Sequence, residues 1–405
     1  MNKKTKLRLV LILCVLALFG VGLLLNKPSE KQDLPAVKPI PMPTHTELQA
    51  DKSPQATDLQ KIILSHLKPD EKAAELVEHM TLEQKVGQLF MVGFQTPEAD
   101  DHIKDLITNK HIGNVILFDR NMQTPQQVKK LNASLQGLAQ QSNALPLLIG
   151  VDQEGGDIVR MREHVTRIPS QQQLGKGTTE KVEQTAEQTA TELQAMGFNT
   201  NFAPVLDLSA KDSRSFGTNP ETVYQKGNAV LNGFAKHGIT GAIKHFPGNG
   251  RSQVDPHEDT SSVTVSQADL EKTDAYPFKQ MIANRDSDSF FVMVTHIKYP
   301  AYDKDKPASL SPVIMQDVLR KRFGYKGIIV TDDFEMGAVS KYYPYEEIGV
   351  KALQAGADLI LICHEYEHQL AMYDGVIQAV QKGTLKETRI NEAAERIIKH
   401  KLKAQ

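Results

Sequence analysis

Eight short apolar runs recur along most of the chain, and their rhythm constrains the fold more than any other feature. Each run is rich in Val, Ile, Leu or Phe and is long enough for one buried strand. Stretches with helical periodicity separate most of them, and regular alternation of strand and helix is typical of α/β folds with a parallel sheet. We therefore predict strands at residues 86–94, 112–118, 146–152, 198–207, 238–246, 289–297, 325–333 and 357–363.

Several of the intervening stretches carry helix signals. Thr81 and Gln84 match a capping box, and residues 182–197 and 313–324 are rich in helix formers and end in Gly. Eight strands with helices between them, in about 300 residues, predict a single TIM-like (β/α)₈ barrel. A doubly wound open sheet is the alternative, but no glycine-rich phosphate fingerprint follows the first strand, which counts against a Rossmann domain.

A basic and then apolar segment precedes the barrel. Lys3, Lys4, Lys6 and Arg8 come before residues 9–25, a run of 17 residues without a charge. This order is typical of a secretory signal or a signal anchor. The run is just long enough to span a bilayer and no small-x-small cleavage site follows it, so we favour an uncleaved anchor over a cleaved signal.

The chain is thus expected to have three parts. Residues 1–26 form the signal anchor or signal peptide. Residues 27–57 contain six prolines and form an extended linker, and residues 58–405 form the barrel. This order predicts a protein at the extracellular face of the cell membrane, either anchored there or secreted.

Composition argues against several other kinds of protein. The formal net charge of -2 gives no reason to expect a nucleic-acid partner. Cys14 lies in the apolar run and Cys363 is alone in the body of the chain, so the folded part has no disulfide framework and no cysteine-based zinc site. We expect a monomer with no cofactor and no metal.

Charged residues stand where five successive predicted strands end. In a barrel the carboxyl ends of all strands meet at one face, where catalytic groups gather. One charged strand end is often a cap or a structural ion pair, but five on the same rim predict a binding cleft. In chain order these residues are Asp152 with Arg160, Asp207 with Arg214, Lys244 with His245, His296, and Asp332 with Asp333.

The stretch KHFPGNGRSQVDPHEDT, from Lys244 to Thr260, is the longest polar segment of this rim. Its Gly and Pro content predicts a loop that follows a strand end. Asp255 and His257 are two positions apart, so both side chains can point the same way in an extended segment. A carboxylate beside a histidine fixes its tautomer and tunes its pKa, and such a histidine can exchange protons near neutral pH.

Five ordered motifs resemble glycoside hydrolase family 3, and most of all its bacterial β-N-acetylhexosaminidase branch. They are VDQEGG with a following Arg, NFAPVLDL with RSFG, KHFPGNG with DPH, VMVTHIKYP, and GIIVTDDFEMGAV. The resemblance spans residues 80–400 and implies a TIM-like catalytic barrel, in agreement with the predicted strands.

The resemblance also implies a role for each matching residue. Asp332 would be the nucleophile, and His257, supported by Asp255, the acid/base. Asp157 stands where the family usually has Arg and Asn249 where it often has His, which bears on fine substrate preference rather than on the reaction. The residues implied to bind the terminal sugar are Asp152, Arg160, Arg214, Lys244, His245 and, at the rim, His296.

The expected function is that of an exo-acting β-N-acetylhexosaminidase that removes terminal β-linked GlcNAc from peptidoglycan or its fragments. A retaining glycosidase needs an ionised carboxylate below the anomeric carbon and a proton donor near the leaving oxygen. Asp332 ends an apolar strand and is rigidly held, as a nucleophile requires, whereas His257 lies on a loop that can move when substrate binds.

Three other functions stay open at this point. A phosphorylase would use phosphate in place of water, and a neutral histidine acid/base repels phosphate less than a carboxylate would. A metal-dependent hydrolase could be built on His245, Asp255, His257 and His296. The third is a non-catalytic sugar-binding protein of the cell wall, although such a protein would not need Asp332 or the pair of Asp255 and His257.

Overall fold

The computed structural model describes residues 54–143, 145–252 and 259–404. The apolar run 9–25 and most of the expected linker lie outside these ranges, as do Asp255 and His257. Within the described ranges, no helix is both long and apolar enough to cross a membrane.

Eight parallel strands close into a barrel in chain order, because each strand pairs with the next and β8 pairs back with β1. The predicted (β/α)₈ barrel is therefore confirmed, and the open-sheet alternative is wrong. The strands are β1 (Phe90–Val92), β2 (Asn114–Leu117), β3 (Leu148–Val151), β4 (Thr200–Asn201), β5 (Thr240–Phe246), β6 (Phe290–Val294), β7 (Ile329–Asp333) and β8 (Leu359–Ile362).

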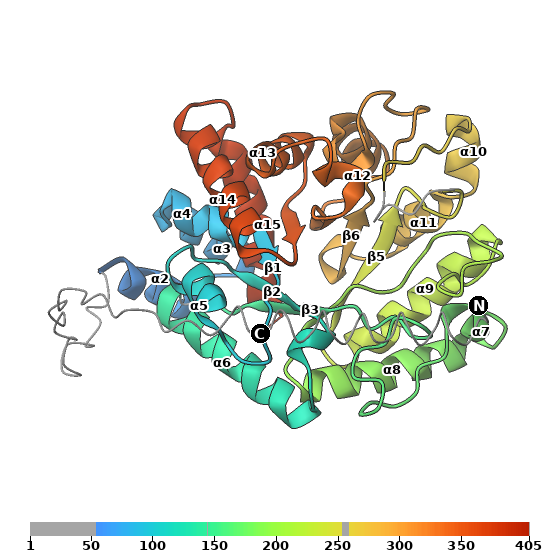
Figure 1. The fold of residues 1–405 in the computed structure, drawn as a ribbon, viewed down its shortest axis with the longest axis horizontal. Coiled ribbons are helices and arrows are strands. Elements are labelled where there is room, and N and C mark those ends of the chain that lie inside the picture. The colour runs from blue at the N-terminus through green and yellow to red at the C-terminus, as the bar shows by residue number, and fades with distance from the viewer. Residues whose placement is uncertain (1–53, 144, 253–258, 405) are drawn as a thin grey trace, which may run out of the picture. The chain divides into compact units, whose positions relative to one another are not determined.

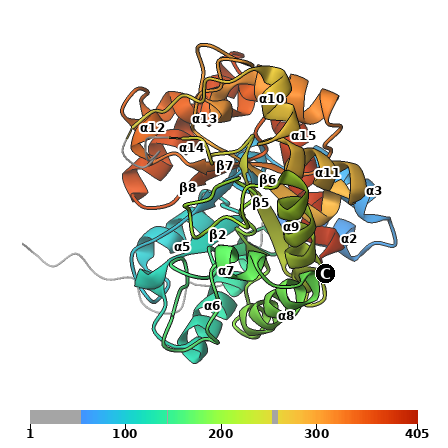
Figure 2. The ribbon, with the colours of Figure 1, turned by 90° about the vertical axis from the view of Figure 1, so that its right-hand side faces the viewer.

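Helices lie around the strands, which gather in the middle of both views (Figures 1 and 2). Neighbouring helices pack side by side, as α8 does with α9 and α13 with α14. The larger helices are α2 (Pro54–Leu64), α3 (Pro69–His79), α4 (Leu82–Gln88), α5 (Asp101–Thr108), α6 (Pro125–Asn143), α8 (Thr179–Ala195), α9 (Pro220–Ala235), α11 (Tyr276–Asn284), α13 (Tyr345–Ala355), α14 (Tyr366–Gln381) and α15 (Glu387–Lys403). Shorter ones are α7 (Gln171–Gly175), α10 (Gln267–Lys272) and α12 (Gly337–Ser340), and residues Val313–Arg322 form a helix of π geometry.

The capping box opens α4 as predicted. The Gln84 backbone N–H donates to Thr81 Oγ1, and the Thr81 N–H donates to Gln84 Oε1. The strand expected at 86–94 is too long, however, because residues 86–88 are the last turn of α4. These three residues are buried as part of α4. The strand begins only at Phe90.

Every residue of the strands β1 to β6 and β8 is buried, as expected for a parallel barrel covered by helices. Strand β7 differs, because its last two residues, Asp332 and Asp333, are only half-buried. The polar end of β7 is thus the point at which the packed barrel opens.

The shortest strand, β4, is extended by a side chain. The Asn201 Oδ1 atom accepts a hydrogen bond from the Gln153 backbone N–H at 2.9 Å, and Asn201 Nδ2 donates to the Gln153 carbonyl at 3.0 Å. The amide group thereby imitates a ladder partner just beyond the end of β3. This pairing fixes the start of the loop that carries the VDQEGG motif.

Candidate active site

A cavity of about 290 Å³ lies at the carboxyl end of the barrel. The ends of β2, β3, β5, β6, β7 and β8 and the loops after β3 and β4 supply its walls. The lining residues are Ile116, Phe118, Asp152, Glu154, Ile158, Arg160, Arg214, Lys244, His245, Met293, Asp332, Asp333, Glu335, Met336, Leu361, Cys363 and His364.

The structure brings most of the predicted site residues together in this cavity. Asp255 and His257 lie outside the described residues, and His296 is not part of the lining. The predicted residues that do line it are Asp152, Arg160, Arg214, Lys244, His245 and Asp332.

Lys244 is the centre of a buried ion network. Its Nζ atom lies 2.7 Å from Asp152 Oδ1 and 2.7 Å from Glu154 Oε1, and the side chain is 4% exposed. Burial alone would lower the pKa of Lys244, but the charges of Asp152 and Glu154 raise it above its usual value. The ammonium group is thus held charged in the cavity wall, where it can donate hydrogen bonds to sugar hydroxyls.

Glu154 joins this network to Arg214 and was not singled out from the sequence. Arg214 binds it in bidentate fashion, Nε to Oε2 at 2.7 Å and Nη2 to Oε1 at 2.8 Å. Burial would raise the pKa of Glu154, but Lys244 and Arg214 outweigh burial and hold the pKa well below its usual range. The sequence signal that could have identified Glu154 is E-G-G, because two successive glycines after a carboxylate indicate a tight turn that only glycine allows.

Both glycines of that turn are required by the backbone. Gly155 and Gly156 have φ angles of 104° and 62°, which residues with a Cβ rarely adopt. A Cβ on Gly155 would also lie 2.4 Å from the carbonyl oxygen of Pro169. The turn folds the loop tightly, so that Glu154 enters the cavity wall and Arg160 returns to it.

Arg160 closes the same side of the cavity. Its guanidinium lies 3.1 Å from Asp119 Oδ2 and 3.8 Å from Asp152 Oδ2, and it covers the Phe118 ring with 5.5 Å to the ring centre. Asp152 is therefore shared between Lys244 and Arg160, and the three side chains present one continuous polar edge.

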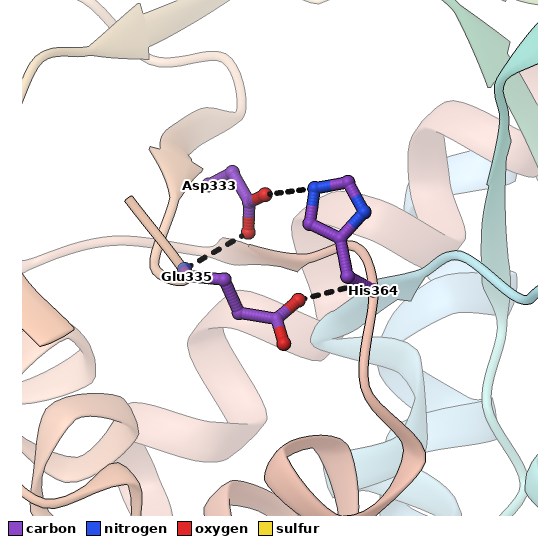
Figure 3. Close-up of side chains that lie close together, drawn as sticks. All are labelled: Asp333, Glu335 and His364. Carbon is purple, nitrogen blue, oxygen red and sulfur yellow. Dashed lines mark hydrogen bonds and ion pairs between the residues drawn. The ribbon is translucent and has the colours of Figure 1, made fainter. Parts of the chain in front are cut away.

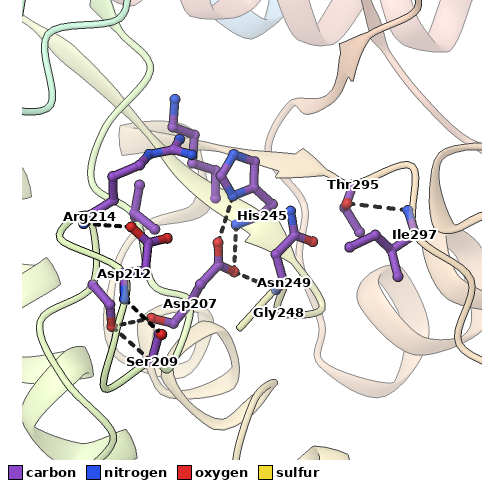
Figure 4. A network of polar contacts seen from close by, with 12 residues as sticks. Asp207, Ser209, Asp212, Arg214, His245, Gly248, Asn249, Thr295 and Ile297 are labelled. Atoms are coloured by element: carbon purple, nitrogen blue, oxygen red, sulfur yellow. Dashed lines mark hydrogen bonds and ion pairs between the residues drawn. The ribbon is translucent and has the colours of Figure 1, made fainter. Parts of the chain in front are cut away.

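His245 is oriented by Asp207 (Figure 4). Asp207 Oδ2 lies 2.7 Å from His245 Nδ1, and Asp207 Oδ1 accepts from the backbone N–H groups of His245 and Asn249. A carboxylate at Nδ1 fixes the tautomer with the proton on that atom, so Nε2 is left to accept a hydrogen bond. Both Lys244 and His245 face the cavity because the pairing of β5 with β6 is irregular between Ile243 and Phe246, which breaks the usual alternation.

His296, expected at the rim among the sugar-binding residues, does not line the cavity in the described part of the chain. It is fully buried, with Nδ1 2.7 Å from Ser309 Oγ and Nε2 2.9 Å from the Asp333 carbonyl oxygen. Its ring stacks on Phe334 at 4.9 Å between ring centres. His296 therefore supports the end of β7 from behind.

Asp332 has the least engaged carboxylate of the cavity. Within the described part of the chain its side chain accepts one hydrogen bond, from the Asp333 backbone N–H to Oδ1 at 3.0 Å, and it forms no ion pair. Burial would raise the pKa of Asp332, but the charges of His245, His296 and Lys244 and the backbone hydrogen bond lower it. The result is an ionised carboxylate with an oxygen to spare at the tip of a buried strand.

Asp333, Glu335 and His364 converge beside it (Figure 3). Asp333 Oδ1 accepts from the backbone of Glu335 and of Cys363, and Asp333 Oδ2 lies 3.1 Å from His364 Nε2. Glu335 accepts from the backbone of His364 and Glu365. These bonds tie the end of β7 to the loop after β8.

The same three side chains are the group in the described ranges that could offer three ligand atoms to a metal ion, all within 4.8 Å of one another. Their carboxylates already hold backbone amides in place, which gives them a structural purpose. Of the metal set considered from the sequence, the Nδ1 atoms of His245 and His296 contact Asp207 and Ser309, and Asp255 and His257 lie outside the described residues, so that set stays a prediction.

The side chains at the two departures from the family pattern do not line the cavity. Asp157 accepts a hydrogen bond from Ser213 Oγ at 3.1 Å, and Asn249 binds Asp207 through its backbone N–H at 2.7 Å. Cavity residues that the sequence interpretation missed are Phe118, Glu154, Glu335 and His364.

Comparison with known proteins agrees with this geometry. Residues 81–400 match the family model described as the glycosyl hydrolase family 3 N-terminal domain. Among curated relatives, a β-hexosaminidase of Nitrosomonas eutropha is 37% identical over 63% of this chain and 74% of its own. One of Tolumonas auensis is 34% identical over 71% of this chain and 86% of its own.

Solved structures give the same result. A glycoside hydrolase family 3 β-N-acetylglucosaminidase from Paenibacillus sp. FPU-7 superposes with a TM-score of 0.77 at 40% identity, over 80% of this chain and 63% of that chain. This chain thus spans less than two thirds of the Paenibacillus protein. A β-N-acetylhexosaminidase from Beutenbergia cavernae superposes with a TM-score of 0.73 at 30% identity, over 80% of this chain and 98% of the other. The chain therefore belongs to glycosyl hydrolase family 3, in the branch that holds the bacterial β-hexosaminidases.

Proposed function

We propose that this protein is an exo-acting, retaining β-N-acetylhexosaminidase that forms its covalent glycosyl-enzyme on Asp332. The observation that carries the proposal is the contrast between Asp332 and the other cavity carboxylates. Asp152, Glu154, Asp333 and Glu335 are each engaged by cations or backbone amides, whereas Asp332 has a free oxygen facing the cavity. A nucleophile needs that freedom, together with the lowered pKa.

The size and lining of the cavity support action on one terminal sugar. Its volume of about 290 Å³ is at the lower limit of ordinary ligand sites, which range over about 300–1,000 Å³. A single pyranose fits such a space and a glycan chain does not. Lys244, Arg160 and Asp152 offer donors and acceptors to neighbouring hydroxyls on one side, and Asp332 faces them from β7.

We assign the acid/base step to His257, with Asp255 holding its ring. Both lie outside the described residues, so the support comes from the sequence and from the chain on either side. Arg251 Nε lies 2.8 Å from Asp274 Oδ2 before the segment, and Asp259 accepts a hydrogen bond from Tyr342 after it. The two ends of the segment are thus fixed to α10–α11 and to the loop after α12.

The electrostatics of the cavity favour water over phosphate as the second nucleophile. Its lining holds five carboxylates and three cationic side chains, from Arg160, Arg214 and Lys244, so the formal balance of these groups, without the two histidines, is about -2. A phosphate dianion entering beside Asp332 would meet net repulsion, whereas water would not. Hydrolysis is accordingly the proposed reaction, and phosphorolysis the alternative that the assay tests.

The deciding experiment measures the release of nitrophenol from aryl β-N-acetylglucosaminide and aryl β-glucoside, with and without phosphate and with and without a chelator. We expect cleavage of the first substrate, little of the second, and no stimulation by phosphate or loss with the chelator. A 2-fluoro sugar inactivator should label the peptide that contains Asp332. Labelling of Asp333, or a rate proportional to phosphate, would overturn the assignment.

The acid/base assignment has its own test. His257→Ala should lower the rate about 10²–10⁴-fold on glycosides with poor leaving groups, and much less on aryl glycosides whose leaving groups need little protonation. Asp255→Ala should follow the same pattern. Equal losses on both kinds of substrate would mean that His257 binds sugar instead.

We also propose that the glycan is peptidoglycan or its fragments and that residues 1–26 hold the barrel at the outer face of the membrane. The basic flank, the apolar run and the proline-rich segment after it support this location. Protease added to intact protoplasts should release an active fragment cut within residues 27–57. Full-length protein in the cytosol would contradict it.

A further inference from the structure

The loop between β4 and α9, residues 202–219, carries two side chains that build the cavity wall. Asp207 orients His245 (Figure 4), and Arg214 binds Glu154 through two hydrogen bonds. The structure describes the whole of this loop, which forms neither helix nor strand. Its shape therefore depends on individual hydrogen bonds rather than on a regular ladder.

Gln171 connects two distant points of this loop. It is the first residue of α7 and is 3% exposed. Its Oε1 accepts from the Val205 backbone N–H at 3.0 Å, and its Nε2 donates to the carbonyls of Val205 at 2.8 Å and of Arg214 at 2.5 Å. An amide offers one acceptor and two donors together, which a carboxylate or an apolar side chain does not. One buried amide thus ties the start of the loop to the residue that binds Glu154.

Gln171 also closes a circuit of hydrogen bonds around the cavity wall. The backbone N–H that follows Val205 donates to the Lys244 carbonyl at 2.7 Å. The Lys244 ammonium lies 2.7 Å from Glu154, and Glu154 binds Arg214. The circuit returns from the Arg214 carbonyl through Gln171 to Val205. The charged groups line the cavity, whereas Gln171 does not, so a neutral amide holds their backbone from outside the cavity.

Helix α7 packs closely against the same loop. A Cβ on Gly175 would lie 2.5 Å from the Phe216 carbonyl oxygen, so only glycine allows this approach. The Gln172 backbone N–H donates to the Ser213 carbonyl at 3.0 Å. These contacts do not depend on the side chain of the first residue of α7. Its substitution can therefore remove the side-chain hydrogen bonds while α7 stays in place.

We propose that Gln171 is a positioning residue for Arg214 in the reaction at this cavity. The bidentate contact of Arg214 with Glu154 requires the guanidinium and the carboxylate to face each other in one plane. A shift of the Arg214 backbone misdirects this pair, and Lys244 shares the same carboxylate. The inference rests on the proposed function, because it concerns how the sugar-binding wall is held in place relative to Asp332.

The test uses Gln171→Met in the full-length chain, which keeps the length of the side chain and removes its three hydrogen bonds. Gln136→Met is the matched control. Gln136 holds the backbone of Leu147 in the same way, with Oε1 2.9 Å from its N–H and Nε2 3.0 Å from its carbonyl. Leu147 precedes β3, at the end of the barrel opposite the cavity. Both variants lose an amide that holds backbone, but only Gln171 is bonded to Arg214.

We expect kcat/KM for aryl β-N-acetylglucosaminide to fall about 10-fold in Gln171→Met, because misplacement of a positioned group slows a reaction. It should match the wild type in Gln136→Met, although both variants lose thermal stability. In an Arg214→Gln background, Gln171→Met should lower kcat/KM by less than about 2-fold more, because the group that it positions is absent. A 10-fold loss in both backgrounds, or wild-type kcat/KM in folded Gln171→Met, would overturn the proposal.

A spectroscopic signature separates failure of this inference from failure of the proposed function. The Arg214 Nε–H donates to Glu154 at 2.7 Å, so its NMR signal, identified by its absence in Arg214→Gln, should exchange slowly with water. Exchange should be several-fold faster in Gln171→Met and unchanged in Gln136→Met. If the wild type does not cleave the aryl glycoside, the proposed function fails, and this signal alone decides the positioning role. Equal exchange in the wild type and Gln171→Met would refute that role, whatever the activity.

A second variant covers the case in which Gln171→Met does not fold. Gln171→Glu keeps an acceptor for the Val205 N–H and, when ionised, offers no donor to the Arg214 carbonyl. The same loss of kcat/KM and the same faster exchange are expected from it above pH 8. Wild-type values of both quantities would overturn the proposal.

Discussion

Two buried lysines, at opposite ends of the barrel, have opposite electrostatic environments. Lys244 stands near the end of β5, with its side chain 4% exposed and carboxylate oxygens of Asp152 and Glu154 at 2.7 Å. Lys401 lies on α15, 1% exposed, and its Nζ donates at 2.7 Å to two neutral acceptors, Gln88 Oε1 and the Gly113 carbonyl. The pKa of Lys244 is raised, whereas burial lowers the pKa of Lys401 to about 7.

The comparison separates a charged group in the candidate site from a structural polar group. At the open end the lysine is kept charged by its carboxylates and is available to a ligand. At the closed end the amino group links α15 to the residues around β1 and β2 with two hydrogen bonds, and its charge has no counter-ion among the described residues. Burial alone therefore does not indicate whether a lysine is charged, whereas the charge of its hydrogen-bond partners does.

The largest expected effect lies at the open end, next to Lys244. Asp332→Asn should lower turnover by roughly 10³-fold or more, because the covalent step loses its nucleophile. Folding should be unaffected, since the carboxylate accepts only one backbone hydrogen bond that an amide oxygen also accepts. Steady-state rates and thermal unfolding measure the two quantities. Asp333→Asn is the control: its Oδ1 can still accept from the backbone of Glu335 and Cys363, and only the charged contact to His364 is lost, so turnover should fall far less than in Asp332→Asn.

Replacing each of the two lysines by methionine tests directly whether their roles differ. Lys244→Met should lower kcat/KM roughly 10²- to 10³-fold and destabilise the fold by about 3–5 kcal/mol, because Asp152 and Glu154 lose their shared cation. Lys401→Met should leave kcat/KM unchanged. Comparable losses of activity in the two variants would mean that the barrel base and the cavity are coupled in a way the contacts do not indicate.

Glu154→Gln sharpens the account of the open end. The amide keeps the shape but not the charge that holds Lys244 and Arg214, so kcat/KM should fall roughly 10- to 100-fold through misplacement of those groups. The folded pKa of Glu154 is below its usual 4.5, so its stabilising effect is full above pH 4.5 and declines as pH falls toward the lowered pKa. The difference in the free energy of unfolding between the wild type and Glu154→Gln should therefore become smaller as pH falls below 4.5. A constant gap down to acid pH would contradict the ion pairing.

Much of the fold could be predicted because most of the barrel strands consist mainly of apolar residues. All eight predicted strands exist, since buried parallel strands need continuous Val, Ile and Leu, and such runs are visible in one sequence. The strand bounds were predicted less well: the strand expected at 198–207 is only Thr200–Asn201, and the first strand shows one reason. Residues 86–88 belong to α4, because an apolar run that crosses from a short helix into a strand has no internal mark of the boundary.

The candidate site could be predicted where a charged residue lies in the last residues of a strand, as Asp332 and Lys244 do. It was less predictable where tertiary packing decides which way a side chain faces. His296 follows β6 but turns into the core toward Ser309, and Glu154 enters the wall only because Gly155 and Gly156 fold the loop back. His364 follows β8 by the same rule that identified the others, and that rule would have found it.

The smallest expected effect concerns the closed end and appears only in the pH dependence of stability. The pKa of Lys401 is about 7 in the folded protein and 10.5 ordinarily, so between these values the unfolded chain binds one more proton than the folded one. The free energy of unfolding should therefore rise with pH across this window, by at most about 1.4 kcal/mol per unit from this group. Below pH 7 both states are protonated at Lys401 and its contribution to the slope ends.

Lys401→Met isolates that contribution, because every other titrating group is common to the two proteins. Its absolute stability at pH 7 balances two opposing changes: the cost of burying an amine is removed, and the acceptors on Gln88 and Gly113 lose their donor. The dependence of the free energy of unfolding on pH is not affected by these two opposing changes. Urea unfolding at several pH values between 7 and 10 should give a steeper rise for the wild type than for the variant, and parallel lines would mean that Lys401 is charged in the folded barrel after all.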